Sequence, residues 1–326
     1  MVGPAHGDGR FVIVGSTGSV ATSTNGRDWF TQTLPGFYDI RNVAYGGGRF
    51  VAVGNTTGLV SSYQVFVSAD GLLWSNALSG TSFSLFGITR ANGLFIAVGS
   101  GGRILTSPDG ITWTQYTTDS LVRFQSVAYG NGKYVAVGAK VGADMTLSVP
   151  AVYFSTNGTD WLPTTITATN TTKFDLYSVA FGDGVFVAAA GRAPSLGSLG
   201  GMLFSSTDGQ TWQHRYTLPL TLESQDFTGV TYGLGTFVAV GPTGVIYQTP
   251  DVRARLRLEP TFTVGTNAHR LWLSGYSNAL YVIESSTNLL HWDRRSTNRI
   301  FDQEIEIPTA SPPAASHFHR GLFIPE

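Results

Sequence analysis

The nonapeptide GGGRFVAVG at residues 46–54 is one of six copies of one phrase, in which a turn of small residues precedes an apolar run. The others are GDGRFVIVG (7–15), ANGLFIAVG (91–99), GNGKYVAVG (130–138), GDGVFVAAA (182–190) and GLGTFVAVG (233–241). Successive copies follow after 39 to 52 residues, as counted between the aromatic residues Phe11, Phe50, Phe95, Tyr134, Phe186 and Phe237. A period of this size indicates a repeat architecture.

Two further phrases accompany the first and divide each repeat into four short strands. A turn phrase ending in Trp follows the first five copies: STNGRDW (23–29), SADGLLW (68–74), SPDGITW (107–113), STNGTDW (155–161) and STDGQTW (206–212). A strand phrase precedes most copies: NVAYG (42–46), SVAYG (126–130), SVAFG (178–182) and GVTYG (229–233), with GITRA (87–91) a weaker match. Asn-Gly and Asp-Gly between apolar runs are strong hairpin signals.

Four antiparallel strands in each of six units predict an all-β fold, a six-bladed β-propeller spanning residues 1–252. Closure of such units into a ring removes exposed sheet edges. The first copy has only a degenerate first strand at residues 2–6, and the sixth ends in TPDV (249–252) without its Trp. Completion of the sixth blade by residues 253–259, a five- or seven-bladed ring and an open ring therefore remain alternatives.

The turn phrase resembles the Asp-box, or BNR, repeat of sialidase-like propellers, whose pattern is Ser/Thr-x-Asp-x-Gly-x-Thr-Trp. Gly110, Thr112 and Trp113 fit this pattern if Thr106 is its first residue, although Asp109 then falls one place late. Asp70 and Asp208 show the same offset, and Asn replaces Asp at positions 25 and 157. The resemblance implies a propeller. Because Asp boxes occur in hydrolases, receptors and assembly factors, it implies no single activity.

Composition excludes several classes of protein. The chain has 326 residues, no Cys, 13% charged residues and a formal net charge of -1. It therefore has no disulfide framework and no Cys nucleophile, and we expect no nucleic-acid partner, which would require a cationic surface. No apolar run is long enough to span a membrane. The start shows no signal peptide, yet low charge with abundant Ser, Thr and Gly leads us to expect a secreted or cell-surface bacterial protein.

Residues 253–326 differ in pattern and predict a second domain. Strands are expected at 270–275, 279–287, 291–297, 303–308 and 317–324, which together suggest a small antiparallel β-sandwich. The phrase YVIESSTNLLHW (281–292) resembles a short sandwich at the C-termini of secreted bacterial proteins. That resemblance implies an accessory, sorting or docking role. A divergent seventh blade is the alternative, because the same phrase is similar to the propeller turns.

The recurring acids and tryptophans are expected to be structural. Asp70, Asp109 and Asp208 should accept backbone N–H groups of their own turns, since residues repeated around a ring cannot converge on one site. The five Trp residues of the turn phrases should pack between blades. His317 and His319 share one strand face, but they have no acid at metal-ligand spacing, so we expect no metal and no other cofactor.

The functional candidates lie in the links that lead into each repeat's first strand and in those that leave its second strand. Propeller sites usually form where these two sets of links meet over the central channel. The expected ligand-binding residues are Tyr38, Arg41, Arg123, Lys173 and Arg192, and the candidate catalytic acids are Asp39, Asp119, Asp175, Glu223 and Asp226. Mixed charges beside aromatic residues favour binding of a glycan or polysaccharide.

Two alternatives come from other functional classes. A glycoside hydrolase would use two of these acids as a catalytic pair. A structural surface or filament subunit would be completed by a strand from a neighbouring molecule, which the incomplete first and sixth repeats suggest.

Overall fold

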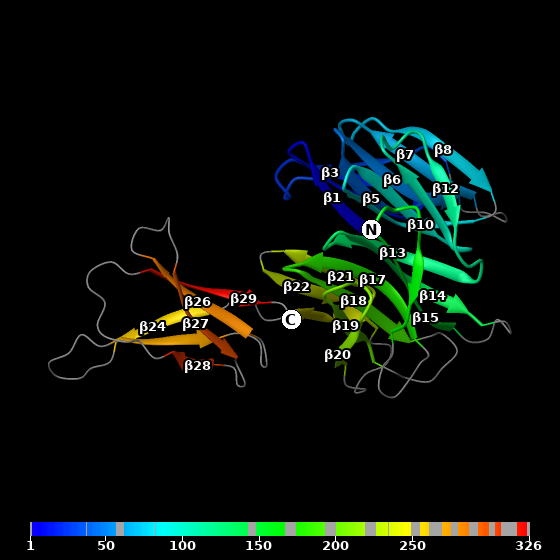
Figure 1. Cartoon of the computed structure of the whole chain (residues 1–326). Coiled ribbons are helices and arrows are strands. Elements are labelled where there is room, and N and C mark those ends of the chain that lie inside the picture. The colour runs from blue at the N-terminus through cyan, green and yellow to red at the C-terminus, as the bar shows by residue number, and fades with distance from the viewer. Residues whose placement is uncertain are drawn as a thin grey trace. The chain divides into compact units, whose positions relative to one another are not determined.

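A computed structural model describes most of the chain (Figure 1). Backbone is described for residues 2–36, 38–56, 62–81, 83–142, 148–166, 174–192, 200–218, 226–233, 235–248 and six strands beyond residue 254. The chain forms two compact units. The first contains residues 1–181, 185–231 and 239–247, and the second contains residues 182–184, 232–238 and 248–326. The predicted domain boundary at residues 252 and 253 lies outside the described residues and stays a prediction.

The propeller has six antiparallel sheets, or blades, as the repeats predicted. Blade 1 is β1 (Val2–Gly7), β2 (Arg10–Val14), β3 (Ser19–Ser23) and β4 (Phe30–Thr33). Blade 2 is β5 (Tyr38–Gly46), β6 (Arg49–Thr56), β7 (Ser62–Ser68) and β8 (Ser75–Thr81). Blade 3 is β9 (Leu85–Ala91), β10 (Leu94–Gly99), β11 (Arg103–Ser107) and β12 (Thr114–Thr117).

The later blades repeat this order. Blade 4 is β13 (Val122–Gly130), β14 (Lys133–Val141), β15 (Ser148–Ser155) and β16 (Leu162–Thr164). Blade 5 is β17 (Phe174–Gly182), β18 (Val185–Arg192), β19 (Met202–Ser206) and β20 (Gln213–Thr217). Blade 6 has three described strands, β21 (Gly229–Gly233), β22 (Thr236–Val240) and β23 (Ile246–Gln248). The two described helices are single turns, Ser16–Gly18 and Pro242–Gly244, and no described helix is long and apolar enough to cross a membrane.

The C-terminal strands form two separate antiparallel sheets. Their bounds are β24 (Arg255–Pro260), β25 (His269–Ser274), β26 (Leu280–Ser286), β27 (Asp293–Arg299), β28 (Glu304–Ile307) and β29 (Phe318–Ile324). The sheet orders are β24-β25-β28 and β27-β26-β29. Completion of the sixth blade by residues 253–259 is therefore wrong, because β24 pairs with β25. Neither sheet has the consecutive strand order of a blade, which also contradicts a seventh blade made of these strands.

Neighbouring blades share apolar cores in the first five blades. Four buried clusters lie between blades 1 and 2, 2 and 3, 3 and 4, and 4 and 5. The second strand supplies both of its faces: in β6, Phe50 and Ala52 join the core with blade 1, whereas Val51 and Val53 join the core with blade 3. The FVAVG phrase is apolar at every position because the strand is covered on both faces.

The turn-phrase tryptophans join these cores in four of five blades. Trp74, Trp113, Trp161 and Trp212 each pack on the cluster that their blade shares with the preceding one. Trp29, in blade 1, is instead exposed. The expectation is wrong at this position, because none of the described residues of the first compact unit forms a blade that covers Trp29.

The glycine that ends the VAYG phrase makes room for the next blade. A Cβ on Gly7 would overlap the ring of Tyr45, and a Cβ on Gly130 would overlap the ring of Phe181. Arg90 takes the same place against Gly46. Each such side chain belongs to the first strand of the following blade. The glycine therefore sets the distance between neighbouring sheets, since any larger residue would push them apart.

The glycine that ends the FVAVG phrase lies opposite a β-bulge in the first strand. Pairing of β5 with β6 skips Arg41, and pairing of β13 with β14 skips Gln125. A Cβ on Gly54 would collide with the carbonyl oxygen of Asp39, and one on Gly138 with that of Arg123. The bulge brings the first strand's backbone so close that only glycine fits beside it.

The bulge also corrects the predicted position of the candidate residues. Ladder pairing continues beyond it, for example from Tyr38 to Thr56. The first and second strands are therefore longer than the repeated phrases. Residues expected in loops lie in strands, namely Tyr38, Asp39, Arg41, Arg123, Asp175 and Arg192.

The turn-phrase acids cap their own turns, as expected. Asp109 Oδ1 accepts hydrogen bonds from the backbone N–H groups of Ile111 and Thr112, both at 2.8 Å, and from the Ser107 hydroxyl at 2.9 Å. Trp113 Nε1 donates to the Gly110 carbonyl at 3.0 Å. Asp70 and Asp208 accept the same set of bonds in their turns. These carboxylates hold hairpins together.

In the two turns that contain Asn in place of Asp, an Asp three residues later accepts a hydrogen bond from the Asn side chain. Asn25 Nδ2 donates to Asp28 Oδ2 at 2.8 Å, and Asn157 Nδ2 donates to Asp160 Oδ2 at 2.8 Å. Where the turn residue is Asp, the position three residues later holds Leu73, Thr112 or Thr211. A second carboxylate there would repel the first, so the two positions change together along the repeats.

We expect the substitution Asn25→Asp to destabilise the protein by about 0.5–1.5 kcal/mol, because a hydrogen bond is replaced by repulsion from Asp28. The double variant Asn25→Asp/Asp28→Thr should recover this loss, since it recreates the pair at positions 109 and 112. Chemical denaturation of the four proteins in this cycle measures the coupling. Additive effects would contradict the proposed link between the two positions.

The turn acids also predict sensitivity to strong acid. Hydrogen bonds from the Thr112 and Ile111 backbone hold the pKa of Asp109 at about 2, below its ordinary value of 3.8. A lowered pKa stabilises the fold above pH 3.8, and this contribution is lost as pH falls through about 2. Thermal melts between pH 7 and pH 2 should show a smaller acid-induced drop for Asp109→Asn, whose amide oxygen accepts the same bonds at any pH. An unchanged drop would contradict this origin.

Candidate functional site

The first strands of neighbouring blades lie against one another, which makes them the inner strands of the propeller. β5 contacts β1 and β9, and β9 contacts β13. One repeat position, which lies two places before the bulge in blades 2, 3 and 4, stands at or just before the start of the first strand. Across blades 2 to 6 this position holds Asp39, Ser84, Arg123, Asp175 and Asp226, which we call the rim residues. They place charges of both signs at one end of the inner strands.

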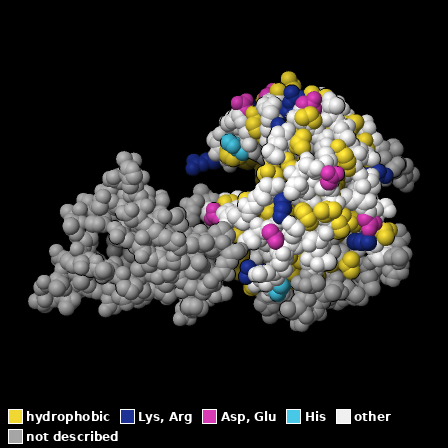
Figure 2. Space-filling model, viewed as in Figure 1, with side chains coloured by type: hydrophobic (Ala, Val, Ile, Leu, Met, Phe, Trp, Pro, Cys, Tyr) yellow, Lys and Arg dark blue, Asp and Glu magenta, His cyan; other side chains and the backbone are white. Residues whose placement is uncertain are grey.

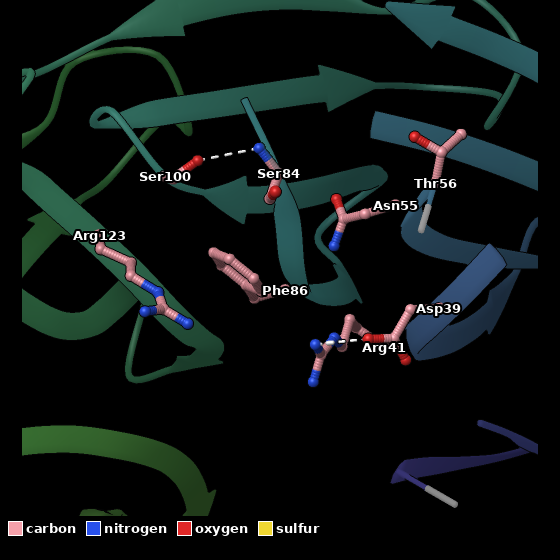
Figure 3. A pocket seen from close by; sticks show the side chains of 8 residues that line it. All are labelled: Asp39, Arg41, Asn55, Thr56, Ser84, Phe86, Ser100 and Arg123. Carbon is pink, nitrogen blue, oxygen red and sulfur yellow. Dashed lines mark hydrogen bonds and ion pairs between the residues drawn. The ribbon is translucent and has the colours of Figure 1, made fainter. Parts of the chain in front are cut away.

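A pocket of about 390 Å³ lies among the rim residues of blades 2, 3 and 4 (Figure 3). Its lining side chains come from the start of the first strands and the end of the second strands. They are Asp39, Arg41, Asn55, Thr56, Ser84, Phe86, Ser100 and Arg123. The sequence predicted Asp39, Arg41 and Arg123, and the structure brings these three to one pocket.

Asp39 and Arg41 form an ion pair on one wall of the pocket. Arg41 Nη2 lies 2.5 Å from Asp39 Oδ2, and both side chains are partly exposed. The Nε atom of Arg41 is buried and donates to no acceptor within the described part of the chain. Because Arg41 is the bulged residue of β5, its backbone is set apart from the ladder. The pair fixes the guanidinium group of Arg41, whose side chain is 43% exposed and lines the pocket.

Phe86 and Arg123 form the opposite wall. The Arg123 guanidinium carbon lies 4.7 Å from the centre of the Phe86 ring, within the range of a cation–π contact. Figure 3 shows Phe86 between Arg123 and the Asp39–Arg41 pair. Phe86 occupies the bulge position of β9, equivalent to Arg41 in β5. An aromatic ring therefore separates two guanidinium groups that belong to different blades.

Asn55 fixes the floor of the pocket and joins blade 2 to blade 3. Its Nδ2 donates to the Leu85 carbonyl at 3.2 Å, and its Oδ1 accepts the Leu85 N–H at 2.8 Å. In blade 3, the Ser100 hydroxyl accepts the Ser84 N–H at 2.9 Å. These groups are committed to the protein backbone. They hold the pocket in shape, and its other lining groups include the two arginines, Phe86 and the Ser84 side chain.

Asp175 and Asp226 continue the rim beyond the pocket. The Ser148 hydroxyl donates to Asp175 Oδ1 at 2.5 Å. Burial raises the pKa of Asp175, and the negative charge of Asp226 acts in the same direction, whereas Ser148 and Arg123 oppose them. Asp226 lies against Gly191, where a Cβ would come 2.5 Å from the Asp226 Cβ. Two carboxylates from adjacent blades thus share one region with Arg123.

The structure places Asp119 and Tyr38 outside the pocket. Asp119 pairs with Lys140 at 2.6 Å and accepts the Leu121 N–H, and these bonds lower its pKa. Tyr38 packs edge-on against Phe66 in the core between blades 1 and 2. Lys173 and Glu223 lie outside the described residues, and for Arg192 the structure describes the backbone alone.

Five lining residues were not predicted: Asn55, Thr56, Ser84, Phe86 and Ser100. Uncharged polar side chains carry little signal in a chain rich in Ser and Thr. Alignment of the repeats would have found Ser84 and Phe86, since they occupy the positions of Asp39 and Arg41. The bulge that aims these positions at the pocket is marked in the sequence by the glycine that ends the FVAVG phrase, but a glycine at the end of a strand does not by itself predict a bulge.

Comparison with known proteins gives the fold. No protein-family model and no curated protein sequence matches the chain. Among solved structures, the WD40 propeller domain of Doa1 is similar with a TM-score of 0.50 and 10% identity, over 76% of this chain and 77% of that one. YCF48 bound to a D1 peptide has a TM-score of 0.48 and 16% identity, over 75% of this chain and 91% of that one. The nidogen/laminin complex has a TM-score of 0.49 and 14% identity, over 71% of this chain and 85% of that one. The fold is a β-propeller. At such identities the likeness carries no function.

Proposed function

We propose that this propeller is a binding protein that takes a glycan or polysaccharide at the rim pocket. The single observation that supports this most strongly is that two guanidinium groups, which are hydrogen-bond donors, line the pocket on either side of the Phe86 ring: those of Arg41 and Arg123. Sugar hydroxyls and carboxylates are acceptors for such donors. A pocket that combines a few fixed polar groups with one apolar surface has the usual composition of a ligand site.

Charge distribution supports a local site and not an extended electrostatic surface. The formal net charge is -1. On the face shown in Figure 2, basic and acidic side chains are scattered among each other. Recognition would therefore depend on hydrogen bonds inside the pocket, where each charged bond contributes about 1.5–3 kcal/mol.

We expect a glycan array to identify a ligand whose affinity falls at least about tenfold in Arg123→Ala and in Asp39→Ala, since the first loses a donor and the second releases Arg41. Isothermal calorimetry measures both. Arg103→Ala is the matched control, because Arg103 is a cation of blade 3 that stacks on Phe83 and does not line the pocket. Unchanged affinity in both pocket variants would exclude this site.

A glycoside hydrolase is the second candidate function, and the pairing of Asp175 with Asp226 favours it. Hydrolysis of a glycosidic bond requires one carboxyl group that keeps its proton and one that is ionised. Burial and the neighbouring charge push Asp175 toward the protonated form, and Asp226 lies close enough to contribute to that shift. Asp175 would protonate the leaving oxygen, and Asp226 would accept a proton from the attacking water.

Release of reducing sugar from a panel of polysaccharides tests this candidate. If the propeller is a hydrolase, Asp175→Asn and Asp226→Asn should each lower the rate by about 100-fold or more, the usual size of a general acid or base contribution. Asp119→Asn is the control, because Asp119 is paired with Lys140 and is not among the groups that shift the pKa of Asp175. Binding of a polysaccharide without release of reducing sugar would contradict the hydrolase and would agree with the glycan-binding function.

We extend the proposal to the kind of propeller, to the C-terminal sheets and to the location of the protein. The turn geometry supports kinship with Asp-box propellers, and we propose that the two C-terminal sheets pack as a small β-sandwich with an accessory or docking role. Secretion or display at the cell surface would agree with a glycan ligand. Fractionation of the native host, with detection by antibody, tests that location.

A further inference from the structure

Blade 1 has an exposed apolar face where every later blade is covered. Its leading face, defined by His6, Phe11 and Trp29, is the face that would pack against a preceding blade. Phe11 is 36% exposed, whereas the residues at its position in blades 2 to 5 are fully buried. Trp29 is 38% exposed, compared with 8% for Trp212 at the same position of blade 5. This face has the apolar residues of a blade interface, but none of the described residues of the first compact unit covers it.

Blade 6 has the opposite face uncovered. Its trailing face, defined by Val240 and Ile246, is the one that would pack against a following blade. Val240 is 42% exposed, although Val53, Val98 and Val137 at its repeat position are fully buried. Ile246 is 72% exposed, in contrast to the buried Ile104. Both exposed faces belong to the first compact unit, and within that unit neither is covered.

The internal blade interfaces show what a leading face accepts. A Cβ on the turn glycine Gly71 would contact Val12 of blade 1, and Gly110 lies in the same way against Val51 of blade 2. Gly209 repeats this arrangement against Val135 of blade 4. In blade 1, the equivalent Gly26 has only Phe11 of its own blade within 4 Å. A leading face therefore binds the trailing face of another blade.

We propose that a second copy of this chain covers the leading face of blade 1 with the trailing face of its own blade 6. Each copy carries both halves of the interface, and the two halves have the composition that already packs at the internal interfaces. The contact joins two different surfaces and is therefore head-to-tail. Phe11 and Trp29 of one copy would pack against Val240 and Ile246 of the other copy. Burial of these side chains removes exposed apolar surface from water.

Analytical ultracentrifugation of the full chain over about 1–100 µM tests the proposal, a range that covers micromolar association. The wild type should increase in mass with concentration. Trp29→Asp and Ile246→Asp should each stay monomeric, because each places a carboxylate in one half of the interface. Leu73→Asp is the matched control: Leu73 is 80% exposed on a turn of blade 2 and should associate like the wild type.

A mixture of the two interface variants separates a head-to-tail contact from a symmetric one. The Trp29→Asp chain keeps its trailing face, and the Ile246→Asp chain keeps its leading face. An equimolar mixture should therefore form a dimer and nothing larger. Because this readout requires both variants to be folded, recovery of association also shows that neither substitution unfolds the chain.

Three results would overturn the proposal. A wild type that remains monomeric throughout the range would show that the faces are covered within one chain or remain exposed. Association that persists in both interface variants would place the contact elsewhere. A mixture that fails to associate, although each variant melts at the wild-type temperature, would contradict the head-to-tail arrangement.

Discussion

Close packing of one blade against the next is the interaction on which the rest of this structure depends. Each blade alone is a small sheet with two apolar faces, and it is stable only when neighbours cover them. Gly7 and Gly130 show how closely the sheets approach, since each lies under a ring of the following blade. This distance fixes where the inner strands end, and hence where the rim side chains of different blades can meet.

The rim pocket is a consequence of that packing and of a defect in the ladder. The bulges at Arg41 and Phe86 set these residues apart from regular pairing. Asn55 then ties blade 2 to blade 3 through two backbone hydrogen bonds. Groups from three blades converge although they are far apart in the chain. The turn phrases, which are the most recognisable motif of the repeat, do not line the pocket, and their acids stabilise the hairpin turns.

The sequence was most informative where the chemistry is local. Asp109 and Asn25 act on backbone groups two and three residues away, so their roles could be read from the turn phrase alone. It was least informative where chemistry depends on distant partners. Trp29 and Trp74 occupy identical motifs, yet one is exposed and the other packs in a core, because burial depends on which blade lies alongside. Phe86 was missed because an aromatic residue in a strand looks like core until the bulge is known.

The sequence by itself determined the number of repeats, the four-strand order of a blade and the capping role of the turn acids. Each of these depends on residues close together in the chain, whose hydrogen bonds and turn preferences need no tertiary partner. Tertiary structure alone decided that Asp39, Arg41, Phe86 and Arg123 surround one pocket, and that Trp29 of blade 1 and Ile246 of blade 6 are exposed among the described residues. Those facts depend on distances between blades, which are set by packing across many residues and leave no local pattern in the chain.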